Sequence, residues 1–234
     1  MVKVNSALIL YFVAFAFFVI AVIIGSDNLE LFTKPIIIPS IYYYYYISVR
    51  GKIDYLFSFS VFSFFVGEIL HLINREEFYL PGLIFLLIPY FIVLYFLILD
   101  LLYYLKKKKI IINTISFYIA FTLLVYLFYN VLMMMIEDNS FTFFIYSLYG
   151  LSLLIMGALV FIMQINYTNK TILFSGIMVA CFIVSDLFFD FYKKLPDLLA
   201  LKIINVSAQE LSFFCYISYF IYRTKFKLYG KRST

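Results

Sequence analysis

The stretch VFSFFVGEILHLI, residues 61–73, decides how this chain must fold, because it carries Glu68 and the only histidine, His71, inside an otherwise apolar run. A second apolar run, ACFIVSDLFFD at 180–190, places Asp186 in a similar setting. A charge at the centre of a bilayer costs about 2.5–3.5 kcal/mol or more, so acids within membrane helices usually face the interior of a bundle. We therefore predict that both runs are membrane helices and that their acids meet in one pocket.

The composition of the 234 residues supports a membrane protein. Hydrophobic residues make up 65% of the chain and charged residues 13%, and the mean hydropathy is +1.02. Soluble domains are about half apolar and a quarter charged, so a water-soluble core could not bury this many apolar side chains. We predict one transmembrane domain over 1–222 and a basic cytoplasmic tail over 223–234.

The predicted fold is an all-α polytopic bundle of about eight transmembrane helices. A span needs about 20 mostly apolar residues. The candidate spans are 6–25, 35–49, 54–73, 80–104, 111–136, 141–164, 171–191 and 198–222. The connections are short and polar, which predicts antiparallel neighbours. Pro35 and Pro39 are expected near the start of the second span, and proline in the first turn of a helix loses no hydrogen bond.

Basic residues are distributed unevenly between the two ends of such a bundle. The side with both termini holds 13 of the 18 lysines and arginines, and the opposite side holds most of the acids. The positive-inside rule then places both termini in the cytoplasm and the spans in the cell membrane. The KKKK run at 106–109 and the tail would attract anionic headgroups, and a nucleic-acid partner is not expected.

Polar groups on three spans fall at one expected depth. Glu68, Asp186 and Asn130 each lie seven residues before a charged residue at the outer end of their span, about 10 Å below the rim at ~1.5 Å per residue. Lys34, at the expected start of the second span, could reach the same pocket and compensate a carboxylate. Glu210, on the eighth span, is expected to make a local pair or to snorkel toward the surface. The other candidate contacts are His71, Tyr129, Ser185 and Gln209.

The residue types in this pocket suit two chemistries. Two carboxyl groups in different environments can act as acid and charged partner in cleaving an acetal-like or enol ether bond, as in glycosidases. The spacing of Glu68 and His71 also matches the E-x-x-H motif of carboxylate-bridged metal bundles, but those need a second such motif. A mononuclear site of Glu68, His71, Asp186 and Asp190 has weak support, and no metal is expected.

Several short motifs resemble, in order, those of the YhhN-like family of integral membrane proteins, whose characterised members are lysoplasmalogenases. The matching segments are Thr33-Lys34-Pro35, SFFVGEILHLI, FYLPGLIFLL, Gly157-Ala158-x-x-Phe161, Ser185-Asp186 and Ala208-Gln209. The chain departs from the family pattern at two positions. The aspartate of the family's G-D pair is Glu68 here, and the histidine expected after Phe85 is Pro89.

The resemblance implies a hydrolase that cleaves the vinyl ether bond of a lysoplasmalogen, a lysophospholipid-like membrane lipid, without a cofactor. Glu68 is expected as proton donor and Asp186 as its charged partner, an assignment that could be reversed, while Lys34 could face the phosphate. The departure at Pro89 keeps open a non-catalytic family member that binds lipid. A transporter is a third alternative, because intramembrane acids also serve ion pathways.

Overall fold

The computed structural model describes residues 5–73, 77–106, 115–134, 140–195 and 197–230, and these residues form eight α-helices. The helices are α1 (Ser6–Ile24), α2 (Asp27–Ser48), α3 (Tyr55–Ile73), α4 (Tyr79–Leu105), α5 (Ile115–Met134), α6 (Ser140–Asn166), α7 (Lys170–Lys194) and α8 (Leu199–Gly230). The predicted all-α bundle is confirmed, with each predicted span matched by one helix.

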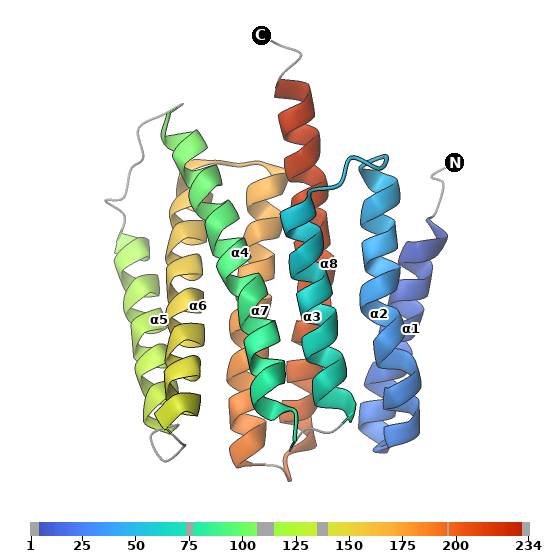
Figure 1. Cartoon of the computed structure of the whole chain (residues 1–234). Helices are drawn as coiled ribbons and strands as arrows, with labels where there is room; N and C mark the ends of the chain where they lie inside the picture. Colours follow the sequence, from blue (N-terminus) through green and yellow to red (C-terminus); the bar gives the residue numbers. More distant parts are fainter. Residues whose placement is uncertain (1–4, 74–76, 107–114, 135–139, 196, 231–234) are drawn as a thin grey trace.

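Six helices form a closed ring of neighbours, and two lie outside it (Figure 1). Around the ring, α2 packs on α3, α3 on α4, α4 on α6, α6 on α7, α7 on α8, and α8 on α2. Helix α1 packs against α2 and α8, and α5 packs against α6. The two ends of the chain lie at the same end of the bundle (Figure 1).

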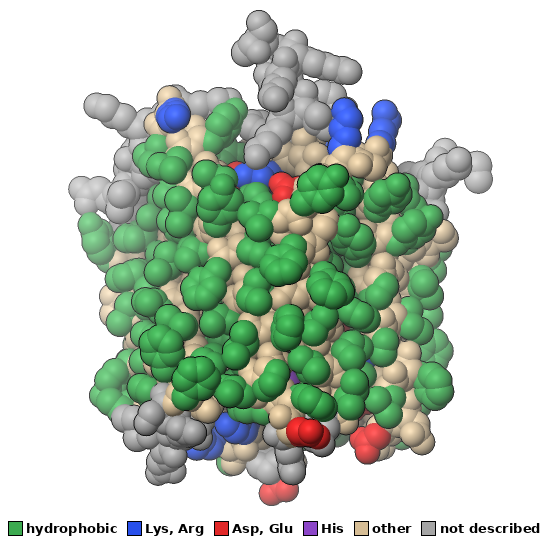
Figure 2. All heavy atoms as spheres, viewed as in Figure 1, with side chains coloured by type: hydrophobic (Ala, Val, Ile, Leu, Met, Phe, Trp, Pro, Cys, Tyr) green, Lys and Arg blue, Asp and Glu red, His purple; other side chains and the backbone are tan. Residues whose placement is uncertain are grey.

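The outer surface suits lipid. Five of the described helices, α1, α3, α4, α6 and α7, are individually long and apolar enough to cross a membrane. Figure 2 shows hydrophobic side chains over the middle of the visible face, with most lysine, arginine and acidic side chains toward its two ends. A bundle of helices satisfies its backbone hydrogen bonds internally, as the bilayer core requires. The fold is that of a helical membrane bundle.

Aromatic side chains fill the centre of the ring. The Phe64 ring on α3 lies next to those of Tyr90 on α4, Phe182 on α7, and Phe213 and Tyr216 on α8, with centroids 5.3–6.2 Å apart. Most of these pairs are edge-to-face, an arrangement that aromatic quadrupoles favour. The cluster fixes the spacing of four helices beneath the acids predicted to form the site.

Glycines allow α3 and α4 to approach closely beside Glu68. A Cβ atom on Gly67 would lie 2.8 Å from the Leu86 side chain and 3.1 Å from the Gly82 carbonyl oxygen. A Cβ atom on Gly82 would lie 2.4 Å from the His71 ring. Small residues are the usual means of bringing membrane helices together. These two glycines therefore set the position of Glu68 and His71 relative to α4.

The predicted start of the second span at residue 35 is wrong. Helix α2 begins at Asp27, and Asp27 and Glu30 lie in its first turn, where negative charge interacts favourably with the helix dipole. Pro35 and Pro39 consequently lie inside the helix rather than in its first turn. Lys34 is about two turns into α2, and its ammonium group forms an ion pair with the buried Glu68 inside the bundle.

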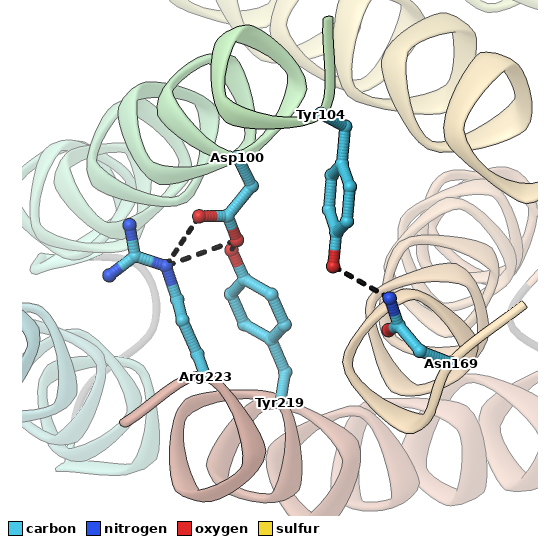
Figure 3. A network of polar contacts seen from close by, with 5 residues as sticks. All are labelled: Asp100, Tyr104, Asn169, Tyr219 and Arg223. Carbon is cyan, nitrogen blue, oxygen red and sulfur yellow. Dashed lines mark hydrogen bonds and ion pairs between the residues drawn. The ribbon is translucent and has the colours of Figure 1, made fainter. Parts of the chain in front are cut away.

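The last helix does not end at the predicted tail boundary of 223. Helix α8 continues to Gly230, and Arg223 is buried. Its Nε donates to both carboxylate oxygens of Asp100 at 2.8 and 3.0 Å, and the Tyr219 hydroxyl donates to Asp100 at 2.6 Å (Figure 3). The Arg223 guanidinium also lies 4.5 Å from the centre of the Phe96 ring. Arg223 thus belongs to the bundle and joins α8 to α4.

A second contact joins α4 to the start of α7 at the same end of the bundle. Asn169, which caps α7, donates through Nδ2 to the Tyr104 hydroxyl at 2.6 Å (Figure 3). The Tyr167 hydroxyl donates to the Tyr104 backbone carbonyl at 2.9 Å. Together with Asp100 and Arg223, these contacts close the end of the bundle that carries the chain termini.

Replacing Arg223 should destabilise the bundle much more than replacing a nearby cation. Arg223→Ala leaves Asp100 largely buried without its cation, and breaking a buried ion pair in this way costs about 3–5 kcal/mol. Lys225→Ala, on the exposed side of the same helix, is the matched control and should be nearly silent. Thermal unfolding in detergent measures both, and equal losses would contradict the structural role of the Asp100 pair.

Candidate functional site

A cavity of about 550 Å³ lies among the helices, and all eight helices contribute to its lining. Its volume is in the range of small-molecule sites, about 300–1,000 Å³. The lining extends from Glu68 to Asp27, Ile73 and Tyr192, which lie at the helix ends remote from the chain termini. The cavity therefore occupies the half of the bundle opposite the Asp100 cluster.

One side of this cavity is polar and the other is apolar. Helices α2, α3, α7 and α8 supply the polar side, with Lys34, Glu68, Asp186, Asn205 and Gln209. Helices α5 and α6 supply the apolar side, which includes Leu124, Leu127, Phe128, Leu153 and Leu154. The division matches a ligand with a polar end and a hydrocarbon end.

Glu68 lies where three helices meet. Its side chain is almost fully buried, and its Oε2 lies 2.6 Å from the Lys34 Nζ of α2. Gln209 of α8 donates from Nε2 to the other carboxylate oxygen. Hydrogen bonds to an ionised group are shorter and stronger than neutral ones. Glu68 is thus bound by a lysine and by a side-chain amide at a buried position.

Asp186 has a different environment on the same cavity. Its Oδ2 accepts a hydrogen bond of 2.8 Å from the hydroxyl of Tyr90, a buried residue of α4. The Nδ2 of Asn205 donates to the adjacent Ser185, to its backbone carbonyl oxygen at 2.8 Å and to its Oγ at 3.1 Å. Among the described residues, no lysine or arginine forms an ion pair with Asp186. The predicted convergence of Glu68 and Asp186 on one cavity is confirmed, and the catalytic roles stay predictions.

Pro89 is accommodated inside α4 without a break in the helix. Because proline has no N–H, the Phe85 carbonyl loses its helical donor, and the Ser63 hydroxyl of α3 donates to that oxygen at 2.7 Å. Tyr90, the residue after Pro89, was not singled out from the sequence, and its hydroxyl donates to Asp186. The feature of the sequence that could have identified Tyr90 is its position next to Pro89.

Lys34, His71, Ser185 and Gln209 all line the cavity, as expected. The His71 Nε2 lies 3.2 Å from the Tyr79 carbonyl oxygen, and its ring stacks on Tyr79. In the described part of the chain, no three His, Cys, Asp or Glu side chains converge as a metal site would require. Glu68, His71, Asp186 and Asp190 therefore do not converge as a mononuclear site would require.

Tyr129 and Asn130 were predicted to lie in the same pocket as the acids, and neither lines the cavity. Tyr129 is exposed on the outer face of α5. The Asn130 amide donates to the Tyr126 carbonyl of its own helix at 2.7 Å. Each residue turns a helix by about 100°, and α5 presents Phe128 and Val131 to the cavity instead. Asn130 was expected at the same depth as Glu68 and Asp186, but its side chain points away from the cavity that they line.

The expectation for Glu210 is wrong as well. Its side chain is only 1% exposed and does not snorkel. Within the described residues its Oε2 has no hydrogen-bond partner, while its backbone carbonyl accepts from the Tyr11 hydroxyl of α1. Helix α8 contacts α1, α2 and α7, so it has little free surface for a charged side chain to reach.

Charged residues at the end of the cavity were not singled out from the sequence. Lys202 of α8 donates to Glu30 of α2 at 2.9 Å, and both residues line the cavity together with Asp27. This ion pair joins α8 to α2 at the end of the bundle remote from the chain termini. A polar headgroup in the cavity would therefore meet charges of both signs.

No family model, curated protein or solved structure matches the chain. The fold and the site together define a helical membrane protein with two unlike carboxyl groups on an amphiphilic cavity. Its function has to be inferred from that cavity and from the motifs that line it.

The Lys34–Glu68 pair gives a test of the site's electrostatics. Lys34→Met should lower the free energy of unfolding by about 3–5 kcal/mol, because it leaves Glu68 buried without its cation. Adding Glu68→Gln should restore most of the loss, since the double variant buries no charge at this position. Thermal unfolding of the two single variants and the double variant measures the coupling, and purely additive effects would show that the two residues do not interact.

Proposed function

We propose that this chain is a membrane hydrolase of the lysoplasmalogenase type, which cleaves the vinyl ether bond of lysoplasmalogens. The observation that carries the proposal is the pair of acids on one amphiphilic cavity. Glu68 is bound to a lysine, and Asp186 is bound to the hydroxyl of Tyr90. Different environments are the means by which two carboxyl groups take different roles in acid-base chemistry.

The contacts favour the reverse of the assignment expected from the sequence. A neighbouring cation stabilises a carboxylate, and burial without a cation stabilises the neutral acid. Lys34 therefore favours a charged Glu68, and the setting of Asp186 favours a carboxyl group that keeps its proton. In this proposal Asp186 is the proton donor and Glu68 is the anion.

The reaction needs only these groups and water. Asp186 transfers its proton to the vinyl carbon that is not bound to the ether oxygen, and the electron pair of the double bond forms the new C–H bond. Glu68 stabilises the resulting oxocarbenium ion. Water adds to the carbon bonded to oxygen and returns a proton to Asp186, giving a hemiacetal. The bond between this carbon and the glyceryl oxygen then breaks, the hemiacetal hydroxyl transfers its proton to the glyceryl oxygen, and the products are an aldehyde and a glycerophospho compound.

The cavity suits the two ends of such a substrate. The leucines and Phe128 of α5 and α6 would contact the alkenyl chain. The charged residues at the end of the cavity, among them Lys202, would face the headgroup. The ether would then lie between them, near Glu68 and Asp186. If the basic end of the bundle is cytoplasmic, the headgroup would enter from the outer leaflet.

The resemblance to the YhhN-like family gains support from where its motifs lie. Lys34, Glu68, Ser185, Asp186 and Gln209 come from four separate motif segments, and all line the cavity. At the departure from the family pattern, Pro89 supplies no side-chain donor, but the adjacent Tyr90 donates to Asp186. A hydrogen bond from the fourth helix to this acid is therefore present.

A second candidate is a lipid-binding protein without catalysis. The buried ion pair between Lys34 and Glu68 favours it, because this contact joins α2 to α3 and could serve structure alone. In that case the amphiphilic cavity would retain a lysolipid without changing it. The two functions differ in whether an aldehyde is released.

Protein purified into nanodiscs should release aldehyde from a lysoplasmalogen. Asp186→Asn should lower kcat by about 10²–10⁴-fold, the usual contribution of general acid-base catalysis. Glu68→Gln should lower kcat by about 10²–10³-fold, because it removes the charge that stabilises the oxocarbenium ion. Asp197→Asn makes the same carboxyl-to-amide change at an exposed residue, and Asn130→Ala alters the outer face of α5, so both should be silent. Bound lysolipid without aldehyde release would establish the binding function instead.

Tyr90→Phe should lower kcat with little change in KM. It removes a hydrogen bond to Asp186 worth about 0.5–1.5 kcal/mol, which corresponds to roughly tenfold in rate at the upper limit. Tyr95→Phe, on the exposed face of the same helix, is the matched control. A change confined to KM would show that Tyr90 contacts the lipid and does not position the acid.

A further inference from the structure

A second, smaller chamber of about 40 Å³ lies beside the main cavity and shares both acids with it. Residues that line the chamber but not the main cavity are Phe64, Tyr90, Phe182, Ser212 and Phe213. We propose that this chamber is a binding site for internal water. If the proposed hydrolysis is right, the chamber also supplies the water that the reaction consumes.

The size and lining of the chamber fit water. A cavity of about 10–15 Å³ can hold one water molecule if it also offers two to four polar partners. A chamber of about 40 Å³ exceeds that need. Glu68, Tyr90, Ser185, Asp186 and Gln209 all present polar atoms on its wall. Apolar cavities stay dry, so this polar wall is the decisive feature.

The existing hydrogen bonds leave capacity for water on several of these groups. The Ser185 hydroxyl oxygen accepts from Asn205, so its proton is available to donate. The Tyr90 hydroxyl donates to Asp186 and can still accept. Gln209 donates through its amide nitrogen to Glu68, which leaves its amide oxygen as an acceptor. A water molecule here would find donors and acceptors within one small space.

The location of the chamber separates water from lipid. Three phenylalanines, Phe64, Phe182 and Phe213, wall the chamber and do not line the main cavity. A lipid chain in the main cavity would displace solvent there and leave the chamber untouched. Water held against Glu68 and Asp186 could then reach the oxocarbenium ion without crossing the hydrocarbon part of the cavity.

Two buried serines provide a matched test. Ser212 and Ser175 are both 0% exposed, and each hydroxyl donates to the backbone carbonyl three residues earlier. Only Ser212 lines the chamber. Ser212→Val puts methyl groups into the chamber, whereas Ser175→Val makes the same change away from both cavities. Ser212→Thr and Ser175→Thr form a milder pair that keeps the hydroxyl, if the valine variants do not fold.

Radiolytic hydroxyl labelling in ¹⁸O-water detects the water directly and needs no substrate. Phe64 and Phe213 should be labelled in the wild type and in Ser175→Val, and their labelling should fall to that of Phe57 in Ser212→Val. Phe57 is 0% exposed and lines neither cavity. No labelling of Phe64 and Phe213 above Phe57 in the wild type would overturn the proposal, whether or not the protein hydrolyses a vinyl ether.

Kinetics test the catalytic half of the inference. Ser212→Val should lower kcat on the order of 100-fold, as misplacement of a reactant by about 1 Å can do, with KM unchanged. Ser175→Val should retain full activity. Normal turnover in Ser212→Val would show that the chamber does not supply the water used in the reaction. Labelled phenylalanines in a wild type that releases no aldehyde would leave the water site standing and refute the proposed function alone.

Discussion

The buried ion pair between Lys34 and Glu68 is the interaction on which the rest of the site depends. Removing two charges from water costs several kcal/mol per ion, and only close geometry with additional hydrogen bonds offsets that cost. Here the ions lie 2.6 Å apart and Gln209 contributes a further bond. These contacts bring α2, α3 and α8 together at one depth. The pair also makes the two acids different, because within the described ranges Glu68 has a lysine partner and Asp186 has none.

The fold was predictable from the sequence because the membrane leaves few alternatives. Apolar runs of about 20 residues, short polar connections and uneven lysines together indicate eight helices with both ends on one side. The start of α2 was missed because Asp27 and Glu30 look like loop residues in a hydropathy reading. In the structure they form the first turn of the helix, where its dipole favours acids.

The site was predictable only where a residue was chemically unusual in its surroundings. Glu68 and Asp186 stand out as acids within apolar runs, and both reach the cavity. Tyr90 did not stand out, because it is one of 23 tyrosines. The prediction for Asn130 failed because counting residues gives only the position of a side chain along its helix. The direction of the side chain depends on which face of the helix packs against neighbouring helices. Glu210 was misplaced because the burial of α8 by three other helices is a property of the whole bundle.

The proposed mechanism requires a charged Glu68 and a protonated Asp186, and infrared spectroscopy at neutral pH can observe both forms. The wild-type protein is compared with Asp186→Asn and Glu68→Gln in the same membrane preparation. We expect Asp186→Asn to remove a protonated-carboxyl band and Glu68→Gln to remove a carboxylate band. Loss of the protonated band in Glu68→Gln, with none lost in Asp186→Asn, would contradict the account.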